Sequence, residues 1–367
     1  MKIAIITLND NNNYGNRLQN YALEKFLKSN FLVEVDTIWY DEKSLYKSTI
    51  NLWSWKSLIK YIFNKGNFRR YIKDFYINDC IRMYNIEKFT KKIKTKLDFC
   101  LKDNISNEYD YFIVGSDQVW NPFFWFKDNQ RKARLLLFTI REKKIAYSAS
   151  FGISNIPESY RKIFKEALND IRSISVREKA GSEIIEKLIG KKVPVLVDPT
   201  ILLFKEEWQK IEIVPEWYKA EKYILTYFLG NSSPVIEKIA EKNNWKIYNL
   251  MDKNNFDLYT SRVEEFIYLI NHAQLVVTDS FHACVFSILM NIPFLVVNRQ
   301  EIGMADMTSR IDTLMELFGY QDRYIVNGKC ELSEKDILYM DFSNVKAIQK
   351  REIERSVVYM KKALKLE

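Results

Sequence analysis

Short apolar runs alternate with stretches of helical periodicity along most of this chain, and this alternation limits the fold more than any other feature. Each run is expected to form a buried strand, and each stretch between runs an amphipathic helix. The predicted strands are residues 2–8, 32–39, 111–114, 144–149, 173–176, 193–197, 223–229, 246–248, 275–278 and 293–297. Such alternation is typical of an α/β fold in which parallel sheets carry helices on both faces.

The alternation stops near residues 199–220, where two prolines and a charged stretch predict a linker. The chain therefore divides into two Rossmann-like domains that face a central cleft, residues 1–204 and 205–342. A helical insert, residues 41–102, interrupts the first domain. A final amphipathic helix within residues 343–367 closes the chain and could pack back on the first domain. At 367 residues, the chain is long enough for a full core in each domain.

The positive charge of the chain is concentrated in the insert. The whole chain has a net charge of +9, and residues 51–102 alone carry 13 Lys/Arg and four Asp/Glu. Aromatic residues alternate with the basic ones at helical spacing: Trp53, Trp55, Tyr61, Phe63, Phe68, Tyr71, Phe75 and Tyr76. Two helices with a solvated basic face would show this pattern, and so would a surface that docks on an anionic membrane or a lipid-linked substrate. No nucleic-acid motif accompanies the charge, so no nucleic acid is expected as a partner.

Cysteine and histidine are too few and too scattered for a metal site. None of the four cysteines belongs to a C-x-x-C pair: Cys80, Cys100, Cys284 and Cys330. Only His272 and His282 could add a ligand, so no metal is expected. The first apolar run is too short for a signal peptide, and no apolar stretch reaches the roughly 18 residues of a membrane span. We therefore expect a reduced cytoplasmic protein, in which residues 51–102 could provide peripheral contact with the inner face of the membrane.

Ligands of open parallel sheets bind outside the carboxyl ends of the strands, so the loops after the strands hold the candidate site residues. The first such loop precedes a helix that is expected to run from Arg17 to about Ser29. The start of this helix could offer backbone N–H groups to an anion, and Gly15 would permit a tight turn before it. An ordinary capped loop is the alternative. The substrate-binding candidates in this region are Asn13, Tyr14, Gly15, Asn16, Arg17 and Gln19.

Three further loops carry groups that suit acid–base chemistry or anion binding. Asp117 could act as an acid or base, hold a sugar hydroxyl, or simply cap a helix. Arg177 carries a guanidinium suited to a carboxylate or phosphate, or to a surface ion pair. His282 lies in the first turn of a predicted helix, where the positive helix end favours anionic ligands, although a lone histidine is often structural. The substrate-binding candidates beside these three catalytic candidates are Gly115, Ser116, Gln118, Trp120, Asn121, Asp279, Ser280, Phe281 and Arg310.

Six segments that contain these residues resemble the polysaccharide pyruvyl transferase family. In chain order they are NYGNRLQNYAL, DYFIVGSDQVWNP, ISVREKAG, VPVLVDPTILL, VEEFIYLINHAQLVVTDSFHACVFSILMNIPFLV and SRIDTLMELFG. The resemblance covers residues 1 to about 320, apart from the basic insert. It implies the two-domain architecture of GT-B glycosyltransferases, with the acceptor on the side of the N-terminal domain and the donor on the side of the C-terminal domain.

The resemblance further implies transfer of pyruvate from phosphoenolpyruvate to two hydroxyls of a sugar, which forms a cyclic ketal and releases phosphate. Phosphoenolpyruvate would be the donor substrate, and no cofactor would be needed. The acceptor would be a sugar or a lipid-linked oligosaccharide of a cell-surface polysaccharide, such as a capsule or an exopolysaccharide. By resemblance, His282 and Arg177 would bind the donor or take part in catalysis. We expect Asp117 to hold or deprotonate the acceptor diol.

Two other functions stay open at this point. A nucleotide-sugar-dependent GT-B glycosyltransferase would use an acidic residue to hold the ribose of its donor. Glu264 or Glu265 could do so, although acids are favoured in the first turn of any helix. A non-enzymatic protein could instead bind a membrane or a polyanion through residues 51–102, with a strong dependence on salt.

Overall fold

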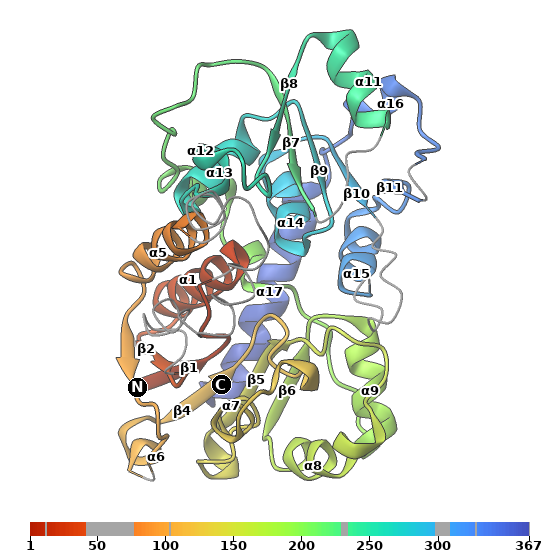
Figure 1. Ribbon diagram of the computed structural model, residues 1–367. Helices are drawn as coiled ribbons and strands as arrows, with labels where there is room; N and C mark the ends of the chain where they lie inside the picture. Colours follow the sequence, from red (N-terminus) through yellow and green to blue (C-terminus); the bar gives the residue numbers. More distant parts are fainter. Residues whose placement is uncertain are drawn as a thin grey trace, which may run out of the picture.

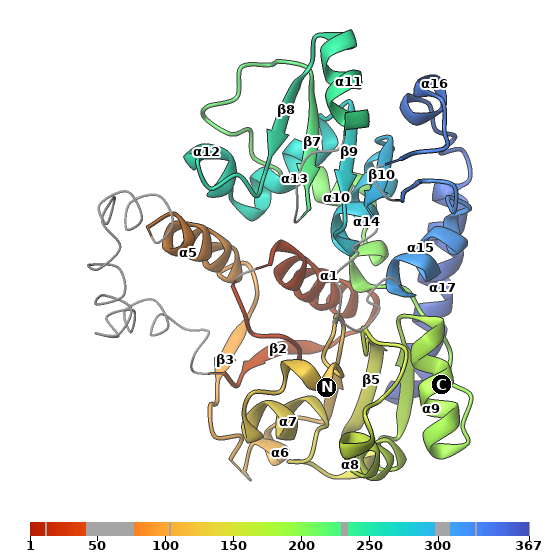
Figure 2. The same cartoon turned by 45° about the vertical axis from the view of Figure 1, so that its right-hand side comes forward.

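The chain folds into two parallel α/β units, and the predicted fold class is thereby confirmed (Figures 1 and 2). The computed structural model describes residues 1–11, 13–41, 77–102, 104–228, 234–297, 309–326 and 329–366. Most of the predicted basic insert, residues 42–76, lies outside these described residues. In the part of the chain that is described, no helix is both long and apolar enough to cross a bilayer.

The N-terminal sheet has six parallel strands in the order β3-β2-β1-β4-β5-β6. The strands are β1 (Lys2–Ile6), β2 (Glu34–Trp39), β3 (Thr95–Leu97), β4 (Tyr111–Val114), β5 (Lys144–Ala149) and β6 (Ser173–Val176). The helices are α1 (Tyr14–Asn30), α5 (Asn78–Thr90), α6 (Ile105–Glu108), α7 (Asp128–Arg134), α8 (Glu158–Asn169) and α9 (Lys179–Ile189). The strand order reverses between β1 and β4, and a crevice for ligands forms at such a reversal.

The C-terminal sheet has five parallel strands in the order β11-β10-β9-β7-β8, so its order reverses between β7 and β9. The strands are β7 (Tyr223–Tyr227), β8 (Lys246–Asn249), β9 (Leu275–Thr278), β10 (Phe294–Val297) and β11 (Tyr324–Ile325). The helices from here to the end of the chain are α10 (Lys205–Gln209), α11 (Pro234–Asn243), α12 (Phe256–Tyr259), α13 (Val263–Asn271), α14 (Phe281–Met290), α15 (Ser309–Phe318), α16 (Glu334–Leu338) and α17 (Val345–Leu364). The carboxyl ends of β7 and β9 face the N-terminal domain.

Successive residues of the central strands pack on opposite faces of the N-terminal sheet, as the pleat of a strand requires. On β1, Ala4 and Ile6 belong to a core beneath α7, α8 and α9. Ile3 and Ile5 belong to a second core, which also contains α1, α13, α14 and the end of α17. This second core is continuous from one sheet to the other, and Figure 1 shows α1 between the two sheets.

The last helix, α17, runs along both domains (Figure 1). Its Tyr359 hydroxyl donates to the carbonyl oxygen of Ala146 on β5, at 2.7 Å. Its Gln349 amide donates to the carbonyl oxygens of Ile201, at 2.8 Å, and Leu203, at 3.0 Å. These contacts attach the carboxyl-terminal helix to the N-terminal sheet and to the connection between the domains.

Three local predictions need correction. The region 41–102 is not wholly helical, because residues 95–97 form the edge strand β3, a three-residue strand too short to show any periodicity. Residues 193–197 form only an isolated bridge, between Val195 and Val176. The helix expected from Arg17 begins three residues earlier, because the Asn13 side chain accepts a hydrogen bond from the Gly15 amide and caps it.

Candidate functional site

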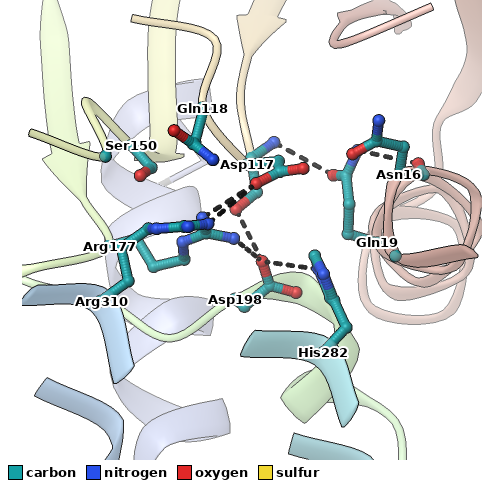
Figure 3. A network of polar contacts seen from close by, with 12 residues as sticks. Asn16, Gln19, Asp117, Gln118, Ser150, Arg177, Asp198, His282 and Arg310 are labelled. Atoms are coloured by element: carbon teal, nitrogen blue, oxygen red, sulfur yellow. Dashed lines mark hydrogen bonds and ion pairs between the residues drawn. The ribbon is translucent and has the colours of Figure 1, made fainter. Parts of the chain in front are cut away.

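A buried carboxylate, that of Asp198, connects side chains from both domains (Figure 3). Its Oδ2 accepts a hydrogen bond from Arg177 Nη1 at 2.7 Å and lies 3.6 Å from His282 Nε2. The Ser116 hydroxyl lies 2.9 Å from the same oxygen. The Thr200 amide and hydroxyl both donate to Oδ1, at 3.0 and 2.7 Å. Asp198 therefore fixes the loops after β4 and β6 and the start of α14 relative to one another.

A second carboxylate, that of Asp117, receives two guanidinium groups. Arg177 Nη2 donates to its Oδ1 at 3.0 Å, and Arg310 Nη1 lies 3.5 Å from the same oxygen. Figure 3 shows the two guanidinium groups side by side. Arg177 is thus held by two carboxylates and by the ring of Phe281, whose centre is 4.3 Å from the guanidinium carbon. Arg310, from α15, keeps 12% of its side chain exposed.

The electrostatic balance of this network keeps both carboxyls ionised. Burial opposes the charge on Asp198, but His282, Arg177 and the Thr200 amide together hold its pKa well below the usual value. Burial also opposes the charge on Asp117, and Arg177, His282 and Arg310 outweigh it, so that the pKa of this carboxyl is lowered too. The two carboxylates in turn outweigh burial at Arg177 and raise the pKa of its guanidinium.

The imidazole of His282 packs against Gly15 of the other domain. A Cβ atom added to Gly15 would lie only 1.9 Å from His282 Nδ1. Gly15 is helical rather than part of a tight turn, which corrects the expectation for this residue. It is glycine because any larger side chain would displace the imidazole.

The loop after β4 needs a special backbone to place Asp117. Gly115 has a φ of +133°, and a Cβ there would lie 2.0 Å from the carbonyl oxygen of Tyr147. Asp117 itself has a φ of +50°. The Ser116 amide between them donates to the Gln19 side chain at 3.1 Å, so α1 supports this loop directly.

A pocket of about 270 Å³ opens between the two domains in front of this network. Below we call it the cleft pocket. Its walls come from the loops after β4, β7 and β9 and from the starts of α1, α14 and α15. The lining residues are Asn13, Asp117, Gln118, Phe124, Tyr227, Phe228, Met251, Asp279, Ser280, Phe281, His282 and Arg310. Among the candidates from the sequence, Arg177 is absent from this wall because it lies behind Asp117.

Several of the predicted binding residues belong to the framework instead. The Tyr14 hydroxyl donates to the carbonyl oxygen of Ser261 at 2.9 Å, so its ring is part of the contact between domains. Arg17 is fully buried, lies over the ring of Trp39 and donates to the carbonyl oxygen of Leu8. Burial lowers its pKa to about 10.

Two more candidates, Trp120 and Asn121, support the site from behind, whereas a third, Asn16, lines a neighbouring pocket. The indole of Trp120 is buried in the core and donates to the carbonyl oxygen of Arg134. Asn121 donates to the Gln118 side chain at 2.8 Å and so positions a residue of the cleft pocket. Asn16 donates to Asp10 at 2.6 Å, and Figure 3 shows Asn16 on α1 across from Asp117.

Asp198 is the main site residue that the sequence analysis missed. It directly follows the apolar run 193–197, so the rule that selected Asp117 and His282 could also have selected it. Glu178 was missed as well. It is fully buried, and its Oε1 accepts from the Ser150 hydroxyl and from the amides of Phe151 and Gly152. Within the described ranges, no group of three or more His, Cys, Asp or Glu is placed to hold a metal ion.

Solved structures similar to this chain include an epimerase, a heptosyltransferase and MurG. The UDP-GlcNAc 2-epimerase of Methanocaldococcus jannaschii is 14% identical, with 98% of this chain and 100% of that chain covered and a TM-score of 0.47. MurG of Acinetobacter baumannii is 8% identical, with 100% and 99% covered and a TM-score of 0.40. The ADP-heptose LPS heptosyltransferase II of E. coli is 10% identical, with 97% and 99% covered and a TM-score of 0.39. All three TM-scores are below 0.5, so the architecture described above rests on the strands and helices of this chain.

No curated protein matches the chain at a significant level. A family model does match, however, and it spans residues 13–301. That range contains the loops after β4, β6 and β9, and with them Asp117, Arg177, Asp198 and His282. The model is that of polysaccharide pyruvyl transferase and covers well over half of the sequence, so the chain belongs to the polysaccharide pyruvyl transferase family.

Proposed function

We propose that this enzyme transfers the pyruvyl group of phosphoenolpyruvate to two hydroxyls of a sugar in a cell-surface polysaccharide or its precursor. The observation that carries the proposal is the cleft pocket, where His282 and Arg310 of the C-terminal domain face Asp117 of the N-terminal domain. An acid–base group, a cation and a carboxylate therefore meet in one small cavity between the domains. Membership of the family supports the same reaction.

The donor anion would bind on the C-terminal side of the cleft pocket. Arg310 lines this wall, and α14, a ten-residue helix, begins there with Ser280 as its N-cap. A helix start offers free backbone N–H groups and a partial positive charge to a phosphate or carboxylate. Arg177 would act differently from the expectation, because both of its terminal nitrogens already donate to carboxylates. Its role would be to hold Asp117 in place.

The proposed chemistry balances without any added reagent. A proton adds to the methylene carbon of phosphoenolpyruvate, and the neighbouring carbon becomes electrophilic. The first sugar hydroxyl forms a bond to that carbon, the bond to the phosphate oxygen breaks, and the second hydroxyl closes the cyclic ketal. Of the two hydroxyl protons, one balances the proton gained by the methyl group, and the other leaves with phosphate.

His282 and Asp117 would divide this work according to their surroundings. His282 is the group in the cleft pocket suited to give the proton to carbon and to take one from a hydroxyl. Asp117 has a lowered pKa, so it is a weak base. It is therefore better suited to orient the acceptor diol through hydrogen bonds than to remove a proton from it.

The glycosyltransferase alternative receives less support from the geometry. Its expected ribose-binding acids, Glu264 and Glu265, do not line the cleft pocket. The Glu265 carboxylate accepts a hydrogen bond from the Arg262 amide at 2.7 Å and caps α13. Glu264 lies 3.5 Å from Lys92. Both acids therefore have structural partners.

The proposal is tested by incubating the protein with phosphoenolpyruvate and a panel of hexose glycosides. We expect phosphate release together with a sugar product heavier by one pyruvate less one water. His282→Ala should lower turnover about 10²–10⁴-fold, the usual contribution of one acid–base group. His272→Ala is the matched control, because this second histidine stacks on Tyr268 away from the cleft. Product from UDP-hexoses in place of phosphoenolpyruvate would overturn the proposal.

Calorimetric titration with phosphoenolpyruvate tests the donor site separately. Arg310→Gln should weaken saturable binding by at least an order of magnitude, about the contribution of one charge-assisted hydrogen bond. Lys162→Gln removes a cation from the exposed face of α8 and should leave binding unchanged. Equal affinity of the wild type and both variants for phosphoenolpyruvate would show that Arg310 does not bind the donor.

A further inference from the structure

A second and larger pocket adjoins the cleft pocket within the N-terminal domain. It has a volume of about 500 Å³, within the range of about 300–1,000 Å³ that is typical of small-molecule sites. Four residues line both pockets: Asn13, Asp117, Gln118 and Phe124. Asp117 therefore stands at the junction, where a group held in one pocket can reach a group held in the other.

Amide side chains dominate the wall of this second pocket, which we call the amide pocket. They come from the loop after β1, from α1, from the loop after β4 and from α7: Asn9, Asn11, Asn13, Asn16, Gln118 and Gln130. An amide offers both a donor and an acceptor at a fixed distance. Such a wall matches a ligand with many hydroxyls, each of which also donates and accepts.

Two of these amides each have one buried polar atom that makes no hydrogen bond to a described residue. Asn9 and Asn16 are only 3% and 2% exposed. Asn9 Oδ1 accepts from the Tyr40 amide and Asn16 Nδ2 donates to Asp10, but Asn9 Nδ2 and Asn16 Oδ1 have no hydrogen-bond partner among the described residues. A buried polar atom without a partner is costly. One donor and one acceptor in the wall of the same pocket indicate a hydroxylated ligand.

An exposed aromatic ring lies at the wall of the amide pocket. Phe126 is 78% exposed although it is a large apolar side chain. A flat apolar ring next to polar groups suits a pyranose, which presents a C–H face to the ring and its hydroxyls to the amides. Phe123, in the same loop, is also exposed, at 55%, but does not line the pocket.

The charge of the wall limits which sugars fit. Its carboxylates are Asp10, Asp41 and Asp117, and its cations are Lys127 and Arg134. The Arg134 guanidinium already donates to the Tyr40 hydroxyl and to the carbonyl oxygen of Phe124. Asp117 is already neutralised by Arg177 and Arg310, so the wall has no net positive charge with which to hold a sugar acid or sugar phosphate, whereas an uncharged sugar needs none.

We propose that the amide pocket binds the acceptor as an uncharged pyranose, with its reacting hydroxyls at Asp117 and its C–H face on Phe126. The assignment of this sugar as the acceptor rests on the proposed function, because the sugar is an acceptor only if a pyruvyl group is transferred to it from the cleft pocket at Asp117. Recognition of the ring itself rests on Asn9, Asn16 and Phe126.

Saturation-transfer NMR tests this assignment without any need for turnover. The probes are the methyl pyranosides of glucose, galactose and mannose, and methyl glucuronide as the charged counterpart. We expect at least one neutral pyranoside to bind the wild-type protein and the glucuronide to bind at least tenfold more weakly. Phe126→Ala should weaken the neutral probe roughly five- to tenfold, the contribution of one aromatic contact. Phe123→Ala, its matched control from the same loop, should bind like the wild type.

Titration of the same three proteins with phosphoenolpyruvate separates the two proposals. Equal donor affinity in all three, with sugar binding weakened roughly five- to tenfold only in Phe126→Ala, supports the amide pocket. If the wild type binds the neutral pyranoside through Phe126 but never consumes phosphoenolpyruvate, the proposed function fails and the sugar site stands. Equal sugar binding by wild type and Phe126→Ala, preference for the glucuronide, or binding of no pyranoside would overturn the sugar site whatever the donor does.

Discussion

The imidazole of His282, from the other domain, fills the space that a side chain at position 15 would need. Gly15 has helical backbone, so its conformation alone would permit alanine, which favours a helix by up to about 1 kcal/mol over glycine. The contact with His282 reverses that preference, because an added Cβ would collide with the ring. Position 15 therefore controls where the proposed acid–base group lies.

We expect Gly15→Ala to lower turnover strongly, because it pushes His282 away from Asp198. In the His282→Ala background, the same change should cost little, because the ring that it meets is gone. The double-mutant cycle for turnover should thus be clearly non-additive. Additive losses in the two backgrounds would show that Gly15 acts through something other than the imidazole.

Asp198 links the stability of the protein to pH. The pKa of this carboxyl, like that of Asp117, is lower in the folded protein than in an unfolded chain, where it is about 3.9. Below that pH the unfolded chain binds more protons than the folded one, so stability rises with pH. The stabilisation is present above about pH 4 and is lost as the pH falls below it.

Urea unfolding between pH 7 and pH 3 measures this linkage. Asp198→Asn should lower the free energy of unfolding at pH 7 by about 3–5 kcal/mol, because it leaves Arg177 buried with one charge partner fewer. Its stability should also fall less steeply than that of the wild type below about pH 4. Asp128→Asn is the control, since this carboxyl is 91% exposed and belongs to a surface ion pair with Arg131. Parallel pH curves for wild type and Asp198→Asn would contradict the linkage.

Only some of the residues of the candidate site were predicted from the sequence. Asp117, Arg177 and His282 each lie within four residues of the end of a well-predicted strand, so their convergence could be expected from the topology of parallel sheets. Asp198 follows the predicted strand 193–197, so the same rule could have selected it, but it directly precedes Pro199, where the predicted linker begins. The motif around Trp120 mixes framework with site residues, and only packing distinguishes them.

Among the elements, most strands were predictable from their apolar runs, but the very short edge strands β3 and β11 were not. The bounds of β4, β5, β6 and β9 agree with the prediction to the residue, because short, mostly apolar runs between polar residues mark buried parallel strands. The edge strand β3 has three residues, two of them exposed, and pairs only with β2. No pattern of burial could reveal it.

The helix α17 shows how one element can stabilise both domains. Gln349 is 3% exposed and donates to two carbonyl oxygens of the connection between the domains. Gln349→Leu should lower the free energy of unfolding by about 1–3 kcal/mol, because both buried acceptors lose their donor. The neighbouring exposed Lys350→Ala should leave it nearly unchanged. Equal midpoints for the two variants in chemical denaturation would show that these hydrogen bonds contribute little.

For the whole molecule, the decisive feature is the apolar core that the two domains share. Two domains of one chain move independently unless their interface is large and apolar. Here a single core runs from Ile3 and Ile5 of the first sheet through α1 to Val276 and Val296 of the second. Tyr14 adds a ring contact with Phe266, with centres 4.6 Å apart, and its hydrogen bond to Ser261. Neither sheet has a complete core without the other domain.

Differential scanning calorimetry should therefore record one cooperative transition, with equal calorimetric and van't Hoff enthalpies. Tyr14→Ala removes a buried ring from the shared core and should lower stability by about 3–5 kcal/mol and broaden or split the transition. Tyr84→Ala, on the exposed side of α5, should keep a single sharp transition. Two separate transitions in the wild type would mean that the domains fold independently. The contact between Gly15 and His282 would then form in only one of several relative positions of the two domains. A single transition would mean that folding itself assembles the cleft pocket, with His282 already facing Asp198 before any substrate arrives.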